Sequence, residues 1–477
     1  MSPGFARARA RNADRWARYP ARVSLLRADL VFDGTRFVAG DVEISLDAGV
    51  ITRVEQVAAD QPAPEGALDA RGSVVMPGLV NAHVHIARGG VFEENERISP
   101  TQAARNLRDA LAAGTTTVGD MACAPAVIDA LRGRVTKHPT AGPQIRAAGP
   151  VLTAPGGYPL DWMPALFVKL GLALPCADEG AAGRAVQRVA AAGMDFVKLA
   201  IMHRSYSDRP LPAVSEPVAR AVVAEAHRSG LRVLAHAHSV ADYRVALAAG
   251  VDALMHSSFE PLDEDTVARV RDAGIPVCPT LWVFESVCLG AEMRLDADER
   301  YTRHVLPYIT RSWRRFMEAY VASEDLVPPG IAGGIPKTRV REAVRAAGAN
   351  LMLLRDAGVP IAFGNDASYG FSLVARPSDE LAAMQRAGMD AEACLRAATS
   401  ESARLLGCTD RGVVRPGARA DLLIVDPRVR DDVAAIDPPR EVIAAGERLG
   451  EARASGFGTA MAFLGGVART AAGVLRG

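Results

Sequence analysis

The feature that most constrains the fold is a regular alternation of short apolar segments and helical patterns through the middle of the chain. Eight apolar segments of strand length occur between residues 74 and 367, at residues 74–85, 115–121, 144–152, 195–201, 231–237, 253–258, 276–281 and 360–367. Strands separated by helices pair in parallel, and eight of them within about 300 residues favour a closed barrel. The alternation therefore predicts an α/β fold of the (β/α)8 TIM-barrel type, with an open doubly wound sheet as the alternative.

The helical patterns between these segments carry start and stop signals. Ser99 and Pro100 suit the N-cap and first position of a helix, and the patterns end at glycine, where a left-handed cap is common. The expected helices are residues 99–114, 217–230, 239–250, 263–274 and 338–358. The long gap at about residues 282–359 predicts an insertion over the barrel mouth, where such folds bind substrates.

Alternating patterns typical of half-buried antiparallel strands flank this central region on both sides. They cover residues 28–32, 40–46 and 49–54 before it, and residues 412–425 and 441–446 after it. Two strands alone would be unstable, so the two groups are expected to combine. We predict a small β-sandwich domain built from residues 23–73 and 412–450, beside a barrel formed by residues 74–411.

The two ends of the chain are expected to lie outside these domains. Residues 1–22 form a basic extension with six arginines and no apolar run of the length that a signal peptide needs. Residues 451–477 are predicted to form a helical tail. Its apolar part is interrupted by Arg469 and by Gly465 and Gly466, which favours a docked helix over a membrane span.

Composition narrows the classes of partner and compartment. Lys+Arg 55 equals Asp+Glu 55, so no overall positive field attracts nucleic acid or an anionic membrane surface. The 6 cysteines include no C-x-x-C pair, which favours free thiols and a cytoplasmic location over a disulfide framework. We therefore expect a cytoplasmic protein, a homo-oligomer, that acts on a small molecule.

Residues typical of metal ligands lie where several of the expected strands end. Strand ends carry His83 and His85, then His236 and His238, then His256, and finally Asp366. Histidines two residues apart project from the same face of an extended chain and can hold one ion. These five histidines belong to a total of only 9 in the chain, so their placement at strand ends indicates a metal centre.

Lys198 lies within the apolar segment at residues 195–201. Burial beside cations disfavours an ammonium, so a lowered pKa is expected, and a neutral amine can react with carbon dioxide to form a carbamate. Such a carbamate is a carboxylate able to bridge two ions. The alternatives are a lysine paired with Asp195 or one that extends to the rim.

The motifs in this order resemble the amidohydrolase superfamily. Residues 77–85, PGLVNAHVH, resemble its first-strand signature. The match continues at residues 114–120, 196–198, 236–238, 256, 279–281, 364–366, 397–407 and 412–425. The most similar branch is the imidazolonepropionase-like, metal-dependent hydrolases that include Xaa-Pro dipeptidases. The resemblance covers about residues 23–448.

This resemblance implies two divalent ions and a set of ligands. His83, His85 and Asp366 would bind one ion, His236 and His256 the other, and carboxylated Lys198 would bridge them. Zinc is expected, although these ligands also suit manganese, iron or cobalt. His238 is left without a metal and is expected to be catalytic or to lie just outside the ligands. The loop residues Tyr158, His203 and Arg204 are candidates for binding substrate, with exposed loop positions as the alternative.

The expected reaction is hydrolysis of an amide, peptide or cyclic amide C–N bond. A hydroxide bridging the ions would attack the carbonyl, and Asp366 would pass its proton to the leaving nitrogen. A one-metal deaminase is an alternative, although Lys198 is not typical of that class and no glutamate follows His236 directly. A lactonase or phosphotriesterase-like activity and a metal-free scaffold also remain open, and the number of bound ions separates several of these possibilities.

Overall fold

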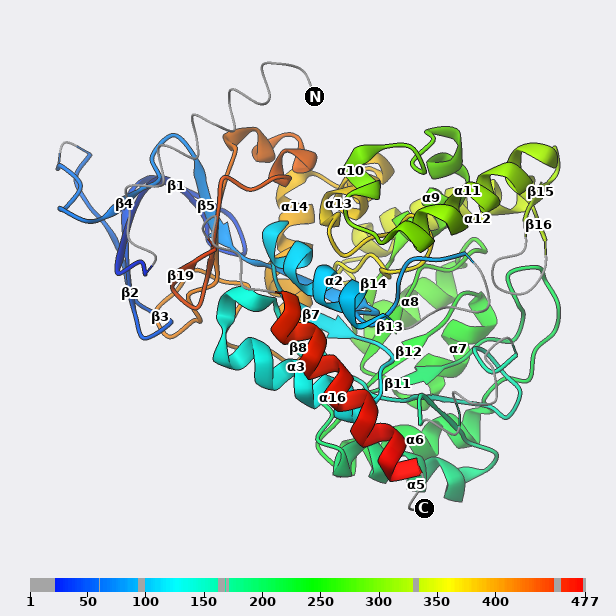
Figure 1. The fold of residues 1–477 in the computed structure, drawn as a ribbon. Helices are drawn as coiled ribbons and strands as arrows, with labels where there is room; N and C mark the ends of the chain where they lie inside the picture. The colour runs from blue at the N-terminus through cyan, green and yellow to red at the C-terminus, as the bar shows by residue number, and fades with distance from the viewer. Residues whose placement is uncertain are drawn as a thin grey trace.

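The computed structural model describes residues 22–59, 61–92, 99–161, 168, 171–328, 334–449 and 456–474 (Figure 1). Most of the predicted N-terminal extension, residues 1–21, therefore lies outside the described residues, as do residues 450–455 and 475–477 of the predicted tail. The described chain alternates strands and helices through its middle, which confirms the α/β class.

Two parallel sheets form the centre of the molecule. One contains β6 (Leu79–Val84), β7 (Thr115–Asp120) and β8 (Gln144–Ala147) in that order. The other contains β10 (Ala173–Pro175), β9 (Val151–Thr153), β11 (Phe196–Ala200), β12 (Arg232–His236), β13 (Ala253–Met255) and β14 (Val277–Cys278), also in that order. All pairs within both sheets are parallel. Their carboxyl ends therefore lie at a common edge, where side chains at strand ends can meet.

The segment expected as the eighth strand, residues 360–367, joins the two sheets without forming a regular strand. Ile361 bridges Val277 of β14, and Ala367 bridges Val84 of β6. The Asp366 N–H donates to the His83 carbonyl at 3.0 Å. Asp366 has a φ of 48°, which interrupts an extended backbone. The closed eight-stranded barrel stays a prediction at this point.

Two other expected strands are each divided. The expectation of one strand over residues 74–85 is wrong: β5 (Val74–Pro77) belongs to the outer sheet, and β6 to a parallel sheet. The chain changes sheets at Gly78, where an added Cβ would lie 2.2 Å from Thr116 Oγ1. Only glycine fits so close an approach. Residues 144–152 likewise form two strands, β8 and β9.

A third sheet combines strands from both ends of the described chain (Figure 1). Its strands are β1 (Leu25–Phe32), β2 (Phe37–Asp47), β3 (Val50–Gln56), β4 (Leu68–Asp69), β5, β17 (Leu422–Val425), β18 (Glu441–Ala444) and β19 (Glu447–Arg448). Antiparallel pairing of β17 with β5 joins the two groups, and one face packs on its own apolar core. The predicted alternating strands thus share one sheet, while their assignment to a separate domain stays a prediction.

Two of the helices that follow the central strands begin with a serine N-cap, and the one at Ser99 is the cap that the sequence predicts. Ser99 accepts from the Gln102 N–H, and Ser239 and Asp242 form a capping box. These helices are α2 (Pro100–Ala112), α3 (Pro125–Lys137), α5 (Glu179–Ala191), α6 (Glu216–Arg228), α7 (Val240–Ala249), α8 (Glu264–Ala273), α13 (Pro377–Ala387), α14 (Ala391–Arg396) and α15 (Ser402–Leu405). Short helical turns occur at Pro139–Ala141, Ala397–Glu401, Pro427–Arg430 and Val433–Ile436.

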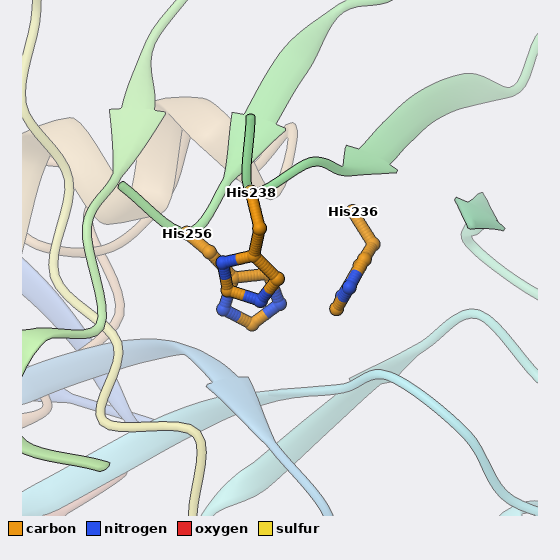
Figure 2. Close-up of side chains that lie close together, drawn as sticks. All are labelled: His236, His238 and His256. Atoms are coloured by element: carbon orange, nitrogen blue, oxygen red, sulfur yellow. The ribbon is translucent and has the colours of Figure 1, made fainter. Parts of the chain in front are cut away.

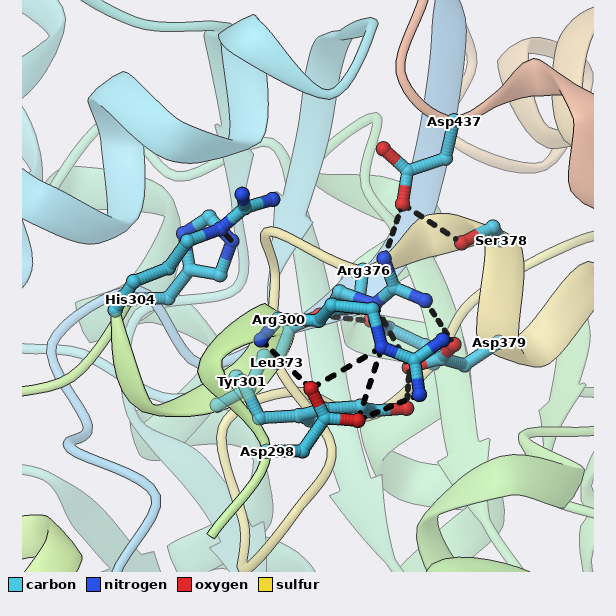
Figure 3. A network of polar contacts seen from close by, with 11 residues as sticks. Asp298, Arg300, Tyr301, His304, Leu373, Arg376, Ser378, Asp379 and Asp437 are labelled. Atoms are coloured by element: carbon cyan, nitrogen blue, oxygen red, sulfur yellow. Dashed lines mark hydrogen bonds and ion pairs between the residues drawn. The ribbon is translucent and has the colours of Figure 1, made fainter. Parts of the chain in front are cut away.

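The segment between β14 and residue 360 is largely helical. It contains α9 (Leu281–Glu292), α10 (Glu299–Thr302), α11 (Pro307–Ala322), β15 (Leu326–Val327), β16 (Ile335–Pro336) and α12 (Lys337–Asp356). A polar network attaches α10 to the rest of the molecule (Figure 3). Tyr301 donates to Asp379 at 2.8 Å, and Arg376 pairs with both Asp379 and Asp437. These contacts connect the helical segment to α13 and to the loop that precedes β18.

The final helix, α16 (Gly456–Val474), packs along α2 and α3 (Figure 1). Phe463 is buried on this face, and an added Cβ at Gly466 would lie 2.5 Å from Val127 Cα. Small residues therefore let the helix lie close against α3. Among the helices of the described residues, none is long and apolar enough to cross a membrane.

Candidate active site

The first histidine pair lies beside a carboxylate from the opposite end of the central region. His83 is buried within β6, and His85 directly follows that strand. Both Nε2 atoms approach Asp366 Oδ1, at 3.3 Å from His83 and 3.2 Å from His85. The three side chains place one potential ligand atom each within 4.8 Å of one another. They could hold one metal ion.

Close packing of the backbone brings Asp366 to this pair. At Gly364 an added Cβ would lie 2.7 Å from the His83 Cβ, so only glycine lets this segment approach β6. The buried Asn81 amide donates to Asn365 Oδ1 at 2.8 Å. Together these contacts hold the end of the segment against β6 and place Asp366 over the two imidazoles.

The second histidine pair joins a third histidine from the next strand. His236 ends β12, His238 follows it, and His256 follows β13 with a φ of 78°. Figure 2 shows the three imidazoles gathered at neighbouring strand ends. Their ring centroids are separated by 4.4 Å to 4.5 Å. These three side chains form a second group that could hold a metal ion.

The two groups lie next to each other. The His83 and His256 ring centroids are 4.6 Å apart, and His256 Nδ1 lies 3.9 Å from Asp366 Oδ2. The Thr280 hydroxyl lies 2.8 Å from the same His256 nitrogen. The structure thus brings all five predicted strand-end histidines and Asp366 into one continuous cluster, which also contacts Thr280.

Lys198 is buried in the middle of β11, beside this cluster. Its side chain is 4% exposed, and its Nζ has no hydrogen-bond partner among the described residues. Burial lowers the pKa of Lys198 to about 7. An unpaired buried polar group costs about 1–3 kcal/mol. The described residues offer this nitrogen no partner that would offset this cost.

The chemistry of the cluster fits divalent ions. Burial, with smaller contributions from neighbouring positive charges, lowers the pKa values of His83, His236 and His256 well below the usual value. Neutral imidazole is the form that binds metals. His236 Nε2 also has no hydrogen-bond partner among the residues that the structure describes, which suits a nitrogen that coordinates an ion.

Two of the three predicted substrate residues reach the adjoining cavity. The Tyr158 ring stacks on His236 at 4.4 Å, and burial raises its pKa to about 12. Arg204 lines the cavity but also forms an ion pair with Asp208. His203 is not among the lining residues of the described chain; its Nδ1 lies 2.6 Å from Oδ1 of Asp242, which does line the cavity.

Asp242 is a site residue that the sequence reasoning missed. Its carboxylate accepts from the backbone N–H groups of His203, His238 and Ser239 at 3.0 Å to 3.1 Å. It therefore connects the turn after β11 to the turn that carries His238. Its place in the capping-box pattern was a visible signal for a local role, but the contact with His203 depends on tertiary structure.

The cavity itself has a volume of about 290 Å³ and opens beside the histidines. His85, His238, Asp366 and Tyr158 line it. Side chains from α9 and α12 of the helical segment line it as well. A small molecule in this cavity would contact the histidine and carboxylate cluster directly. Tyr206, which also lines it and lies 3.4 Å from His238 Nε2, has no distinguishing sequence pattern.

Comparisons with known proteins agree with this architecture. Residues 74–448 match the amidohydrolase family. An uncharacterized protein of Mycobacterium tuberculosis is 28% identical over 389 residues, covering 80% of this chain and 86% of that protein. An imidazolonepropionase of Paracoccus denitrificans is 42% identical over 80 residues, covering 16% of this chain and 19% of that protein.

A solved structure shares the fold over almost its whole length. A Xaa-Pro dipeptidase with bound methionine in its active site superimposes with a TM-score of 0.70 at 22% identity. The likeness covers 89% of this chain and 98% of that chain. The family match extends over most of the chain and confirms the resemblance that the ordered motifs indicate, so this chain belongs to the amidohydrolase family.

Proposed function

We propose that this amidohydrolase-family protein hydrolyses the C–N bond of a small amide, peptide-like or cyclic amide substrate with the aid of two divalent ions. The observation that supports this proposal most directly is the pair of adjoining ligand groups beside a cavity. Lys198, buried and without a partner in the described residues, lies beside both groups.

The residues would divide between two ions. His83, His85 and Asp366 would hold one, His236 and His256 the other, and the carbamate of Lys198 would connect them. Zinc is the expected metal. When bound, such ions lower the pKa of water and polarise a carbonyl group, which supplies a nucleophile at neutral pH. His238 belongs by distance to the second group, so a ligand role and a role in binding substrate both remain open to test.

Asp366 would move the proton. Its side chain is 17% exposed and lines the cavity, so it reaches substrate as well as the imidazoles. The carboxylate would accept a proton from the attacking water and donate it to the departing nitrogen, which must leave protonated because an amide anion is too basic. Tyr158 and Arg204 line the same cavity and could orient polar groups of the substrate.

Further parts of the proposal concern architecture and setting. The two parallel sheets and residues 360–367 would form a (β/α)8 barrel, because the segment contacts both β14 and β6. A cytoplasmic location is supported by the free thiols of all six cysteines. We still expect the protein to form a homo-oligomer and to act on a small molecule. We also expect no nucleic-acid or membrane partner.

Metal analysis combined with turnover tests this function. Purified protein is expected to hold about two ions per chain and to hydrolyse members of a panel of N-acyl amino acids, Xaa-Pro dipeptides and cyclic amides. One ion with release of ammonia from an aminated heterocycle would indicate the deaminase instead. Turnover of lactones alone would indicate the lactonase. Protein that binds no added metal would indicate the scaffold.

A further inference from the structure

Aromatic rings cover one side of the cavity directly beside the histidine cluster. Phe259 stacks on the His238 ring at 4.3 Å with an interplanar angle of 16°. Phe284 meets Phe259 edge-on at 4.5 Å, and Tyr206 lies 5.4 Å from Phe284. These three rings all line the cavity, so a substrate bound at the histidines would contact them.

Helix α9 extends this apolar surface. Val283, Phe284 and Val287 lie at spacings that share one helix face, and all three line the cavity. Phe284 and Val287 are only half-buried, so part of their apolar surface remains open to the cavity. We call Tyr206, Phe259, Val283, Phe284 and Val287 the apolar wall.

The apolar wall has a fixed position because the start of α9 is anchored. Glu380 is fully buried, and its carboxylate accepts from the Leu281 and Trp282 N–H groups at 2.8 Å and 2.6 Å. These two donors belong to the first turn of α9, which otherwise lacks partners for its N–H groups. A surface held in this way selects a substrate without first having to become ordered.

Four of the charged side chains that line the cavity pair with one another or are exposed. Asp208 pairs with Arg204 on one side and with Arg339 on the other, at 3.0 Å from Arg339 Nη1. All three side chains are more than 40% exposed. Glu260 is exposed and accepts from the Val240 N–H. None of these groups belongs to the apolar wall, where a charged substituent would lose hydration without gaining a partner.

We infer that the apolar wall binds a bulky neutral hydrophobic group of the substrate, aromatic or branched aliphatic, next to the bond that is cleaved. This inference rests on the proposed function. The cavity volume of about 290 Å³ lies near the lower end for small-molecule sites, which suits one such group and a short amide rather than a polymer. Edge-on and stacked rings are also the arrangement that aromatic groups prefer.

A side-chain series measures this preference. Two substrate series are used. In Xaa-Pro dipeptides the residue before the cleaved bond is Ala, Leu, Asn or Phe, and in N-acyl amino acids the residue after the cleaved bond is one of the same four. Leu and Asn have similar shapes but differ in polarity. In at least one of the two positions, kcat/KM is expected to be at least about tenfold higher for Leu than for Asn, and higher for Phe than for Ala.

Variants of α9 then connect the preference to the wall. Phe284→Ala should reduce the Phe-to-Ala ratio of kcat/KM about tenfold, mainly through KM. Val287→Phe should lower the same ratio by filling the space. Leu289→Ala is the matched control, because Leu289 lies on the same helix and packs against the protein core but is not among the cavity-lining residues of the described chain. It should leave the ratio unchanged, and metal content and Tm show whether each variant is folded.

The outcomes separate this inference from the proposed function. Amide hydrolysis without apolar preference, or equal ratios in Phe284→Ala and Leu289→Ala, would overturn the inference alone. If no amide is hydrolysed, calorimetry with 4-phenylbutanoate and butanoate decides. Binding of the phenyl compound at least about tenfold more tightly, reduced by Phe284→Ala, would support the wall while the proposed function fails. Equal binding of the two compounds would overturn the inference as well.

Discussion

The two His-x-His pairs have the same spacing but different surroundings. His83 and His85 both direct Nε2 at one carboxylate oxygen of Asp366, at 3.3 Å and 3.2 Å. His236 instead stacks on Tyr158, while His238 stacks on Phe259 and lines the cavity. The spacing therefore determines only that two imidazoles share a face. The segments that pack opposite them determine what each imidazole contacts.

The largest expected effect concerns Lys198. The group of His236, His238 and His256 contains no carboxylate, so the carbamate of Lys198 would be the carboxylate that connects this group to the other ion. Lys198→Ala is expected to lose metal and activity, with partial recovery when short carboxylic acids such as propionate are added. Metal analysis and turnover measure both effects. Lys337→Ala is the control: this buried lysine donates to the Tyr320 and Ser323 carbonyls, so its loss should lower stability without removing metal. An uncoordinated, unmodified Lys198 amine in a metal-loaded crystal structure would falsify the bridging role.

Asp366 is the carboxylate that distinguishes the first pair. Asp366→Asn keeps an oxygen for the metal but cannot accept a proton at neutral pH. We expect it to retain much of its metal and to lose about 10² to 10⁴-fold in amide turnover. Activated aryl esters, whose leaving group needs no proton, should lose less. Equal losses for a matched ester and amide, with metal intact, would remove Asp366 from proton transfer.

The two members of the second pair should differ from each other. His236 Nε2 has no hydrogen-bond partner in the part of the chain that the structure describes, whereas His238 Nε2 lies 3.4 Å from the Tyr206 hydroxyl. His236→Ala is therefore expected to lower metal content more than His238→Ala, which should mainly change turnover or substrate affinity. Each variant serves as the other's control. Equal metal loss in both would show that both imidazoles bind metal.

Asp242 holds the turn that carries His238, one member of the second pair. Asp242→Asn replaces one of the two accepting carboxylate oxygens with an NH2 group, which cannot accept from an N–H, so the turn carrying His238 should loosen and kcat should fall about tenfold. Asp263→Asn is the matched control, because Asp263 caps α8 through the Thr266 N–H. If both variants lower Tm equally and neither changes kcat, Asp242 has only a capping role.

The smallest expected effect is a change in the pH dependence of stability at His203. The hydrogen bond to Asp242 raises the pKa of His203 above its usual value. A raised folded pKa stabilises the protein fully below the unfolded pKa of about 6.5, and the gain disappears as pH rises through the folded value. His203→Gln should therefore lower Tm more at about pH 5.5 than at about pH 8.5, because these two values lie on either side of the titration of His203. A difference independent of pH would contradict this origin.

Much of the fold was predictable because its signals are local. The apolar segments, the cap at Ser99 and the helical pattern at residues 239–250 predicted elements that the structure confirms. The expected strand at residues 74–85 failed because apolar sequence does not reveal a change of sheet at Gly78. The irregular segment at residues 360–367 was also missed, since its bend at Asp366 depends on packing against β6.

By itself, the sequence determined the family, the α/β class and the candidate metal ligands, because strand periodicity and ligand chemistry are properties of neighbouring residues. Tertiary structure alone decided which residues meet. It placed His203 on Asp242, joined Thr280 to His256, and put Phe284 beside His238. Such contacts join segments that are distant in sequence or loops without periodic patterns, and they form only when the strands and helices pack together.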